Sequence, residues 1–129
     1  MQTIKKIILF FLFSIMYISC YESKLQYTGD YKKFLTQAAR LTCKKIQKCY
    51  HHTIRTFPSG EDHFDVEECM NHSLKDIDSK ISKFSEEIIQ LSIACYPKVV
   101  EASCKDFSFI YFKNTSCTTL FFRLQEMRK

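Results

Sequence analysis

The sequence predicts an all-α fold: a disulfide-stapled antiparallel helical hairpin with one or two shorter C-terminal helices packed on it. Two long stretches predict the hairpin, because apolar residues recur along them at steps of three and four with few glycines or prolines between. Seven cysteines in 129 residues predict the staples. A domain of this size gains only modest stability from its core, so such cross-links are expected.

The first 20 residues have the order of a secretory signal peptide. Two lysines precede an apolar run over residues 7–18, which only Ser14 interrupts, and the small residue Ser19 follows. The run is too short for a transmembrane helix, which needs about 20 apolar residues. We therefore expect residues 1–19 to be a signal peptide that is removed during export.

The end of this leader, Tyr17-Ile18-Ser19-Cys20, resembles the lipobox of bacterial lipoproteins, in which a small residue precedes a lipid-modified cysteine. Ser19 and Cys20 match that pattern. Tyr17 stands where leucine is usual, so the match is to the relaxed lipobox of spirochaete lipoproteins rather than to the strict enterobacterial one. The resemblance implies that Cys20 carries acyl chains such as palmitate and anchors the protein, stably where there are two or more. The alternative is simple cleavage of the leader and free secretion.

Six cysteines remain when the one at the end of the leader is set aside: Cys43, Cys49, Cys69, Cys95, Cys104 and Cys117. An even set in an exported chain of about 110 residues predicts three disulfides. No two of them have the C-x-x-C spacing of a zinc site, so no metal is expected.

A single domain is expected to occupy residues 30–129. Residues 20–29 are polar and predict a tether between the lipidated N-terminus and this domain. Asp30 stands where a helix would be capped, and the helical spacing of apolar residues then continues to about residue 55. Pro58-Ser59-Gly60 is a turn signal, and it ends this first arm of the hairpin.

The second arm is expected to be one long helix over residues 63–95, with a kink near residues 71–73. Its apolar residues keep a period near 3.5 throughout, as in packed antiparallel helices. Acidic residues crowd its start, where the helix dipole favours negative charge. Pro97 is expected to stop this helix and to open a short one.

The C-terminal third contains the candidate contact patch. The segment 107–112 fits either a strand or a helix, and helical spacing predicts a last helix over 116–127. If these aromatic side chains are exposed they mark a lipid, ligand or protein contact, and if buried they cover the hairpin. Phe121 and Phe122 add to the patch, whose candidate residues are Phe107, Phe109, Tyr111 and Phe112.

Spacing narrows the disulfide pairing without fixing it. A hairpin folded about the turn places Cys49 opposite residue 70 and favours a Cys49–Cys69 bond, which closes a loop of about 20 residues. The partner of Cys43 must then lie in the C-terminal third. Two pairings remain open: Cys43–Cys104 with Cys95–Cys117, or Cys43–Cys117 with Cys95–Cys104.

The cysteine spacing over residues 43–117 resembles that of the helical six-cysteine lipoproteins exported by diderm bacteria. It has an early C-x5-C pair, Cys43 and Cys49, and a cysteine that opens the next helix, Cys69. A late cysteine, a gap of eight residues and two more cysteines follow. The resemblance implies a helical fold and an exported location, and it implies no activity.

No catalytic constellation is present, so the protein is expected to be neither an enzyme nor a cofactor carrier. The four histidines are expected to be solvated surface residues rather than metal ligands: His51, His52, His63 and His72. Without the leader the chain carries 17 Lys and Arg against 14 Asp and Glu, interleaved in the sequence, so no nucleic-acid partner is expected.

These observations lead to two functional hypotheses. The first is a non-enzymatic envelope lipoprotein, at the outer membrane or cell surface, that acts as a small interaction or binding module. Its partners would be the membrane, through the lipid anchor, and an unidentified protein or apolar ligand. The second is a freely secreted binding protein for an apolar ligand or a host partner.

Overall fold

The computed structural model describes residues 24–54 and 64–128, and over these ranges the protein is all-α and disulfide-stapled, as predicted. The expected leader, Cys20 and the turn at 58–60 lie outside the described residues. The described helices are α2 (Tyr31–Ile54), α3 (Val66–Leu74), α4 (Ile77–Ile81), α5 (Glu86–Glu101), α6 (Cys104–Phe107), α7 (Ile110–Lys113) and α8 (Thr115–Glu126).

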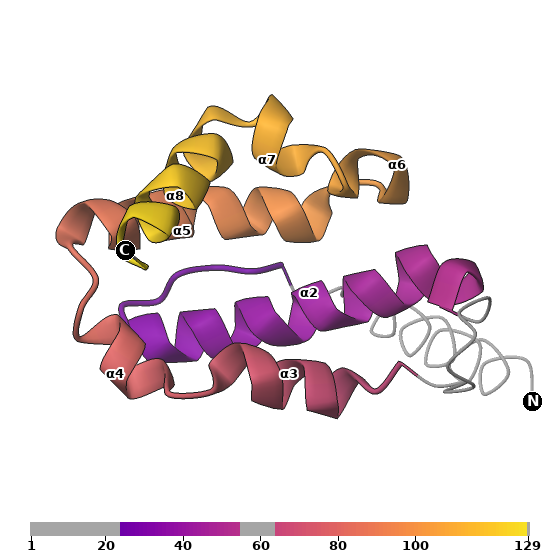
Figure 1. Ribbon diagram of the computed structural model, residues 1–129, viewed down its shortest axis with the longest axis horizontal. Helices are drawn as coiled ribbons and strands as arrows, with labels where there is room; N and C mark the ends of the chain where they lie inside the picture. The colour runs from indigo at the N-terminus through magenta and orange to yellow at the C-terminus, as the bar shows by residue number, and fades with distance from the viewer. Residues whose placement is uncertain (1–23, 55–63, 129) are drawn as a thin grey trace, which may run out of the picture.

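The helices lie in two layers (Figure 1). One layer contains α2 with α3 and α4 along its side, and the other contains α5 with α8 packed against it. α2 also contacts α5 and so joins the two layers, while α6 and α7 form the connection between α5 and α8. Within the part of the chain described, none of the helices combines the length and hydropathy needed to cross a bilayer.

α2 begins directly after Asp30, the residue that the sequence predicted as its N-cap. The Asp30 Oδ1 atom accepts a hydrogen bond from the Lys33 backbone N–H at 2.9 Å, which is the geometry of an N-cap. Four side chains of this helix form a buried stripe: Phe34, Leu35, Ala38 and Cys43. This stripe faces α3 and α4 on one side and α5 on the other, so α2 is the central helix of the fold.

The expected single helix over 63–95 is wrong, because the chain bends twice and forms three helices. The first bend is at Asp76, whose backbone is left-handed with φ of 56°. The second precedes α5, where the Ser85 hydroxyl accepts from the Ile88 N–H at 3.3 Å and caps a new helix. Ser85 and the two glutamates after it are a helix start, so local capping overrides the continuous apolar period.

Pro97 lies inside α5 and does not stop it, which corrects the expected end of that helix. The proline ring fixes φ at a value that a helix accepts. However, Pro97 has no N–H to donate to the Ile93 carbonyl, and its ring crowds that carbonyl. Together the lost hydrogen bond and the steric clash destabilise a helix by about 3 kcal/mol. Val99, two residues after Pro97, is 1% exposed, and Cys95, two residues before it, is fully buried. Burial of this face of the helix offsets that cost.

The domain begins before residue 30, because Leu25 belongs to its core. Leu25 is 4% exposed and packs with Phe34, Leu35 and Ala38, so this residue of the expected tether belongs to the domain. A second cluster lies between α5 and α8, and its buried members are Ile88, Cys95, Val99, Cys117 and Leu120. Phe84 and Tyr96 pack against both clusters and unite them.

Three disulfides join the six cysteines, in a pairing that differs from the favoured one: Cys43–Cys69, Cys49–Cys104 and Cys95–Cys117. The Cys49–Cys69 bond is wrong, and so are both proposed partners of Cys43, while Cys95–Cys117 was one of the two alternatives. Six residues along a helix turn a side chain through about 600°, so Cys43 and Cys49 point about 120° apart. Cys43 therefore faces α3 while Cys49 reaches α6.

Candidate apolar binding site

The aromatic segment 107–112 is helical rather than a strand and is only partly exposed. Phe107 and Tyr111 are half-buried and pack against the α5–α8 cluster, as a cover of the core would. Phe109 is 56% exposed and Phe112 is 82% exposed. The expected contact patch is therefore divided between core and surface.

α8 adds two more exposed aromatic side chains beside this segment. Phe121 is 45% exposed and Phe122 is 60% exposed. The Phe121 ring lies 5.8 Å from that of Phe122 and 6.3 Å from that of Tyr111, measured between ring centroids. The sequence analysis added Phe121 and Phe122 to the patch, and the structure shows that the ring of Tyr111 meets that of Phe121.

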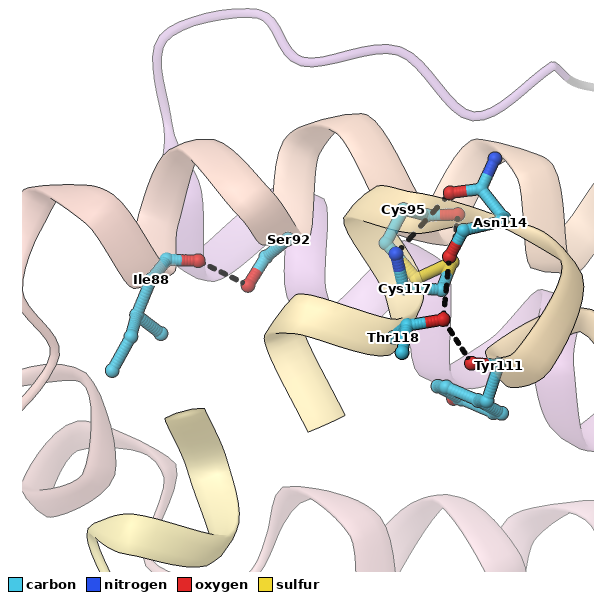
Figure 2. Close-up of a disulfide and its surroundings, with 7 residues drawn as sticks. All are labelled: Ile88, Ser92, Cys95, Tyr111, Asn114, Cys117 and Thr118. Atoms are coloured by element: carbon cyan, nitrogen blue, oxygen red, sulfur yellow. Dashed lines mark hydrogen bonds between the residues drawn. A yellow bond between two sulfur atoms is a disulfide. The ribbon is translucent and has the colours of Figure 1, made fainter. Parts of the chain in front are cut away.

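The buried Cys95–Cys117 disulfide positions α8 on α5 (Figure 2). The Asn114 Oδ1 atom accepts from the Cys117 N–H at 3.2 Å and caps α8. The Thr118 hydroxyl lies between the Asn114 carbonyl, at 3.0 Å, and the Tyr111 carbonyl, and it is within hydrogen-bond range of both. These bonds fix the short turn between α7 and α8, so the aromatic residues on both helices keep one relative position.

Polar contacts join the two ends of the aromatic segment and hold it to α2. Lys113 Nζ lies 2.7 Å from Asp106 Oδ1, and the Ser103 hydroxyl donates to the other Asp106 oxygen at 2.8 Å. The hydrogen bond from Lys113 lowers the pKa of the Asp106 carboxyl, so this carboxylate stays ionised. Tyr50 of α2 is hydrogen-bonded to Ser108, which ties the same segment to the other layer.

These aromatic residues surround a half-open hollow of about 400 Å³, which we call the aromatic hollow. Seven of its eight described lining residues are aromatic or aliphatic, and the hydroxyl of the eighth, Thr118, is already engaged by backbone carbonyls. The lining residues are Tyr96, Tyr111, Phe112, Thr118, Leu120, Phe121, Phe122 and Leu124. Phe109, although exposed, is not one of them.

A second hollow of about 460 Å³, the interlayer hollow, lies where α2, α3 and α4 face the end of α8. Figure 1 shows the end of α8 at the same end of the molecule as α4 and the start of α2. Tyr96, Tyr111 and Leu124 line both hollows, so the two are adjacent. The walls of the interlayer hollow are mostly apolar, and its charged lining residues are Lys80, Lys83 and Arg128.

The two tyrosines that both hollows share are neutral. Burial raises the pKa of Tyr96, and the neighbouring Tyr111 adds to this rise. Burial likewise raises the pKa of Tyr111. Their hydroxyls therefore stay protonated in the physiological range, and they act as hydrogen-bonding groups in an otherwise apolar wall.

Neither hollow has a histidine, aspartate or glutamate among the described residues that line it. In the ranges 24–54 and 64–128, no three His, Cys, Asp or Glu side chains gather in a way that could hold a metal ion. His72 is exposed on α3, whereas the side chains of His51 and His52 and the whole of His63 lie outside the described residues. The lining thus offers apolar contact and cationic groups.

Comparison of the chain with protein-family models, with curated protein sequences and with solved structures finds no significant match. The functional interpretation therefore rests on the two hollows. Sequence reasoning missed Tyr96 and the three cations, because residues of α4, α5 and the end of α8 meet only once the two layers have packed. The helical spacing of Leu120 and Leu124 was visible in the sequence as part of the last predicted helix.

Proposed function

We propose that this protein is a non-enzymatic exported lipoprotein of the cell envelope whose helical domain binds an apolar ligand. The observation that carries the proposal is the aromatic hollow, a concave surface on which Phe112, Phe121 and Phe122 remain exposed. Exposed aromatic side chains around a concavity mark a binding site, because leaving them in water is unfavourable. None of the described residues that line this hollow is a histidine, aspartate, glutamate or lysine, and such a lining favours binding over catalysis.

The shape of this surface favours a small ligand over a protein partner. The aromatic hollow has a volume of about 400 Å³, which lies within the roughly 300–1,000 Å³ typical of small-molecule sites. A protein contact usually needs a patch about 800 Å² in area on each partner, which is a broader surface than one hollow. The ligand would fill the hollow and cover the three exposed rings.

A fluorescence titration with N-phenylnaphthylamine, an uncharged apolar probe, tests the proposed binding. We expect saturable binding to the purified protein. The double variant Phe112→Ser/Phe122→Ser should weaken it by about thirtyfold, because each aromatic contact contributes roughly 1 kcal/mol. Both side chains are exposed, so the variant should fold normally.

Phe109→Ser is the matched control, because Phe109 is an exposed aromatic residue of the same segment that does not line the hollow. It should leave the titration unchanged. The proposal fails if the wild-type protein gives no saturable signal. It also fails if Phe109→Ser weakens binding as much as the double variant does.

The lipid anchor would hold this site close to the membrane. Leu25 is packed in the core, and it lies only five positions after Cys20 in the chain. An extended chain of five residues spans at most about 18 Å, so an acylated Cys20 would keep the domain near the bilayer surface. The intact mass of the exported protein tests this: it should equal residues 20–129 plus acyl chains, whereas an unmodified mass would indicate free secretion.

A further inference from the structure

We infer that the ligand is a long-chain fatty acid whose carboxylate is held at the interlayer hollow by Lys80, Lys83 and Arg128. Its alkyl chain would run past the shared residues into the aromatic hollow. This inference rests on the proposed function and names the ligand class for the same site. It is carried by the charge of one hollow together with the apolar lining of the other.

The three cations come from different elements but line one hollow. Lys80 belongs to α4, Lys83 lies between α4 and α5, and Arg128 follows α8. All three are exposed, and none takes part in an ion pair with another described residue. They therefore form a cationic rim to the hollow, which favours an anionic group on the ligand.

Two neighbouring carboxylates on the same elements are already engaged elsewhere. Asp78 of α4 lies 2.8 Å from Lys32 Nζ, which belongs to α2. On α8, Glu126 is paired with Arg123 at 3.1 Å. With these acids neutralised by other partners, the rim presents a net positive charge to the hollow.

The dimensions indicate a ligand with one chain. The hollows measure about 460 and 400 Å³, and each alone is in the lower half of the range for small-molecule sites. Tyr96, Tyr111 and Leu124 line both, so a chain passing these residues would occupy first one hollow and then the other. A charged head at the rim and an apolar tail among aromatic side chains is the arrangement of a fatty acid.

The test compares dansyl-labelled undecanoic acid with its methyl ester, which has the same fluorophore and chain but no charge. Each is titrated at neutral pH into the purified full chain carrying Cys20→Ser, so that no acyl chain of its own competes. The acid should bind about tenfold more tightly than the ester. Its carboxylate can pair with the three exposed cations of the rim, and each such pair adds a modest amount to the binding free energy.

The variant Lys80→Gln/Lys83→Gln/Arg128→Gln should remove this preference, so that the acid and the ester bind about equally. The matched control is Lys44→Gln/Lys98→Gln/Lys105→Gln, which removes the same charge from exposed lysines that line neither hollow. It should keep the preference for the acid. Loss of the preference in this control as well would overturn the inference, because net charge rather than the rim would then explain it.

Further outcomes separate the inference from the proposed function. Equal binding of acid and ester, with N-phenylnaphthylamine still bound, would overturn the fatty-acid assignment and leave apolar binding intact. Absence of binding by all three probes would overturn both. Displacement of the labelled acid by palmitate supports the inference, whereas displacement by lysophosphatidylglycerol but not by palmitate would overturn it.

Discussion

Cys49, near the end of α2, is bonded to Cys104 at the first position of α6, across 55 residues of sequence. Their Cα atoms lie 5.1 Å apart. The bond fastens the start of the aromatic segment to α2, while Cys95–Cys117 fastens its far end to α5. The elements that bear the aromatic hollow are thus cross-linked to both layers of the fold.

Mild reduction should open the Cys49–Cys104 disulfide first. Cys104 is exposed, whereas Cys95 and Cys117 are both 0% exposed, and a reductant must reach a sulfur atom to attack it. Limited treatment with a phosphine, followed by alkylation and peptide mass spectrometry, should label Cys49 and Cys104 before the other four bonded cysteines. Earlier labelling of Cys95 or Cys117 would show that the reductant reaches this disulfide, which would contradict its burial in the core.

Leu25→Ala should lower the free energy of unfolding by about 2–5 kcal/mol, the usual range for a buried leucine. The expectation follows from the packing of Leu25 against Phe34, Leu35 and Ala38. Urea denaturation followed by circular dichroism measures it. Gln26→Ala, next in the chain and exposed, is the control and should stay within about 0.5 kcal/mol. Equal stability of the two variants would mean that Leu25 is not part of the core and that the tether extends to residue 29, as the sequence predicted.

Tyr31→Phe should raise the free energy of unfolding by about 1 kcal/mol. Among the residues that the structure describes, the buried Tyr31 hydroxyl oxygen has no hydrogen-bond partner, and removing such a group removes its desolvation penalty. Tyr27→Phe is the control, because the exposed Tyr27 hydroxyl donates to the Gly29 carbonyl at 3.2 Å. That change should be neutral or slightly destabilising. A destabilised Tyr31→Phe variant would mean that this hydroxyl has a partner in the folded protein.

Stability should be constant between about pH 7 and 9 and should fall above pH 10. Burial raises the pKa of Tyr96 above the ordinary value of 10.0, so the unfolded chain loses this proton at a lower pH than the folded one. The stabilisation is complete below pH 10 and is lost as the pH rises, by up to about 1.4 kcal/mol per pH unit for this one group. Urea midpoints measured against pH test this, and Tyr96→Phe should reduce the slope. A slope that is unchanged in that variant would assign the effect to other groups.

Local signals in the sequence predicted the parts of the fold that depend on neighbouring residues. Asp30 and the spacing after it located the start of α2, and the spacing around Cys117 located α8. The even number of cysteines predicted three bonds. The two helix positions are decided within a few turns of helix, where spacing and capping act directly, whereas the number of bonds follows from the number of cysteines alone.

The features that sequence reasoning missed depend on how distant elements meet. The pairing of Cys43 with Cys69 depends on how far α3 slides along α2, and no local pattern in the sequence predicts that register. The burial of Leu25 depends on its packing against the buried residues of α2 and on the residues of α5 that pack on the same cluster. Tyr96 became part of the site only because α8, brought in by Cys117, packs over α5.

A disulfide map of the purified protein tests the architecture of the binding site most directly. Trypsin separates all six cysteines, because a lysine or arginine lies between each neighbouring pair. Digestion without reductant should yield three linked pairs of peptides: 41–44 with 56–75, 49–55 with 99–105, and 84–98 with 114–123. Peptide 49–55 linked to 56–75 would contradict the structure, because Cys49 could not then hold α6 and the aromatic segment against α2.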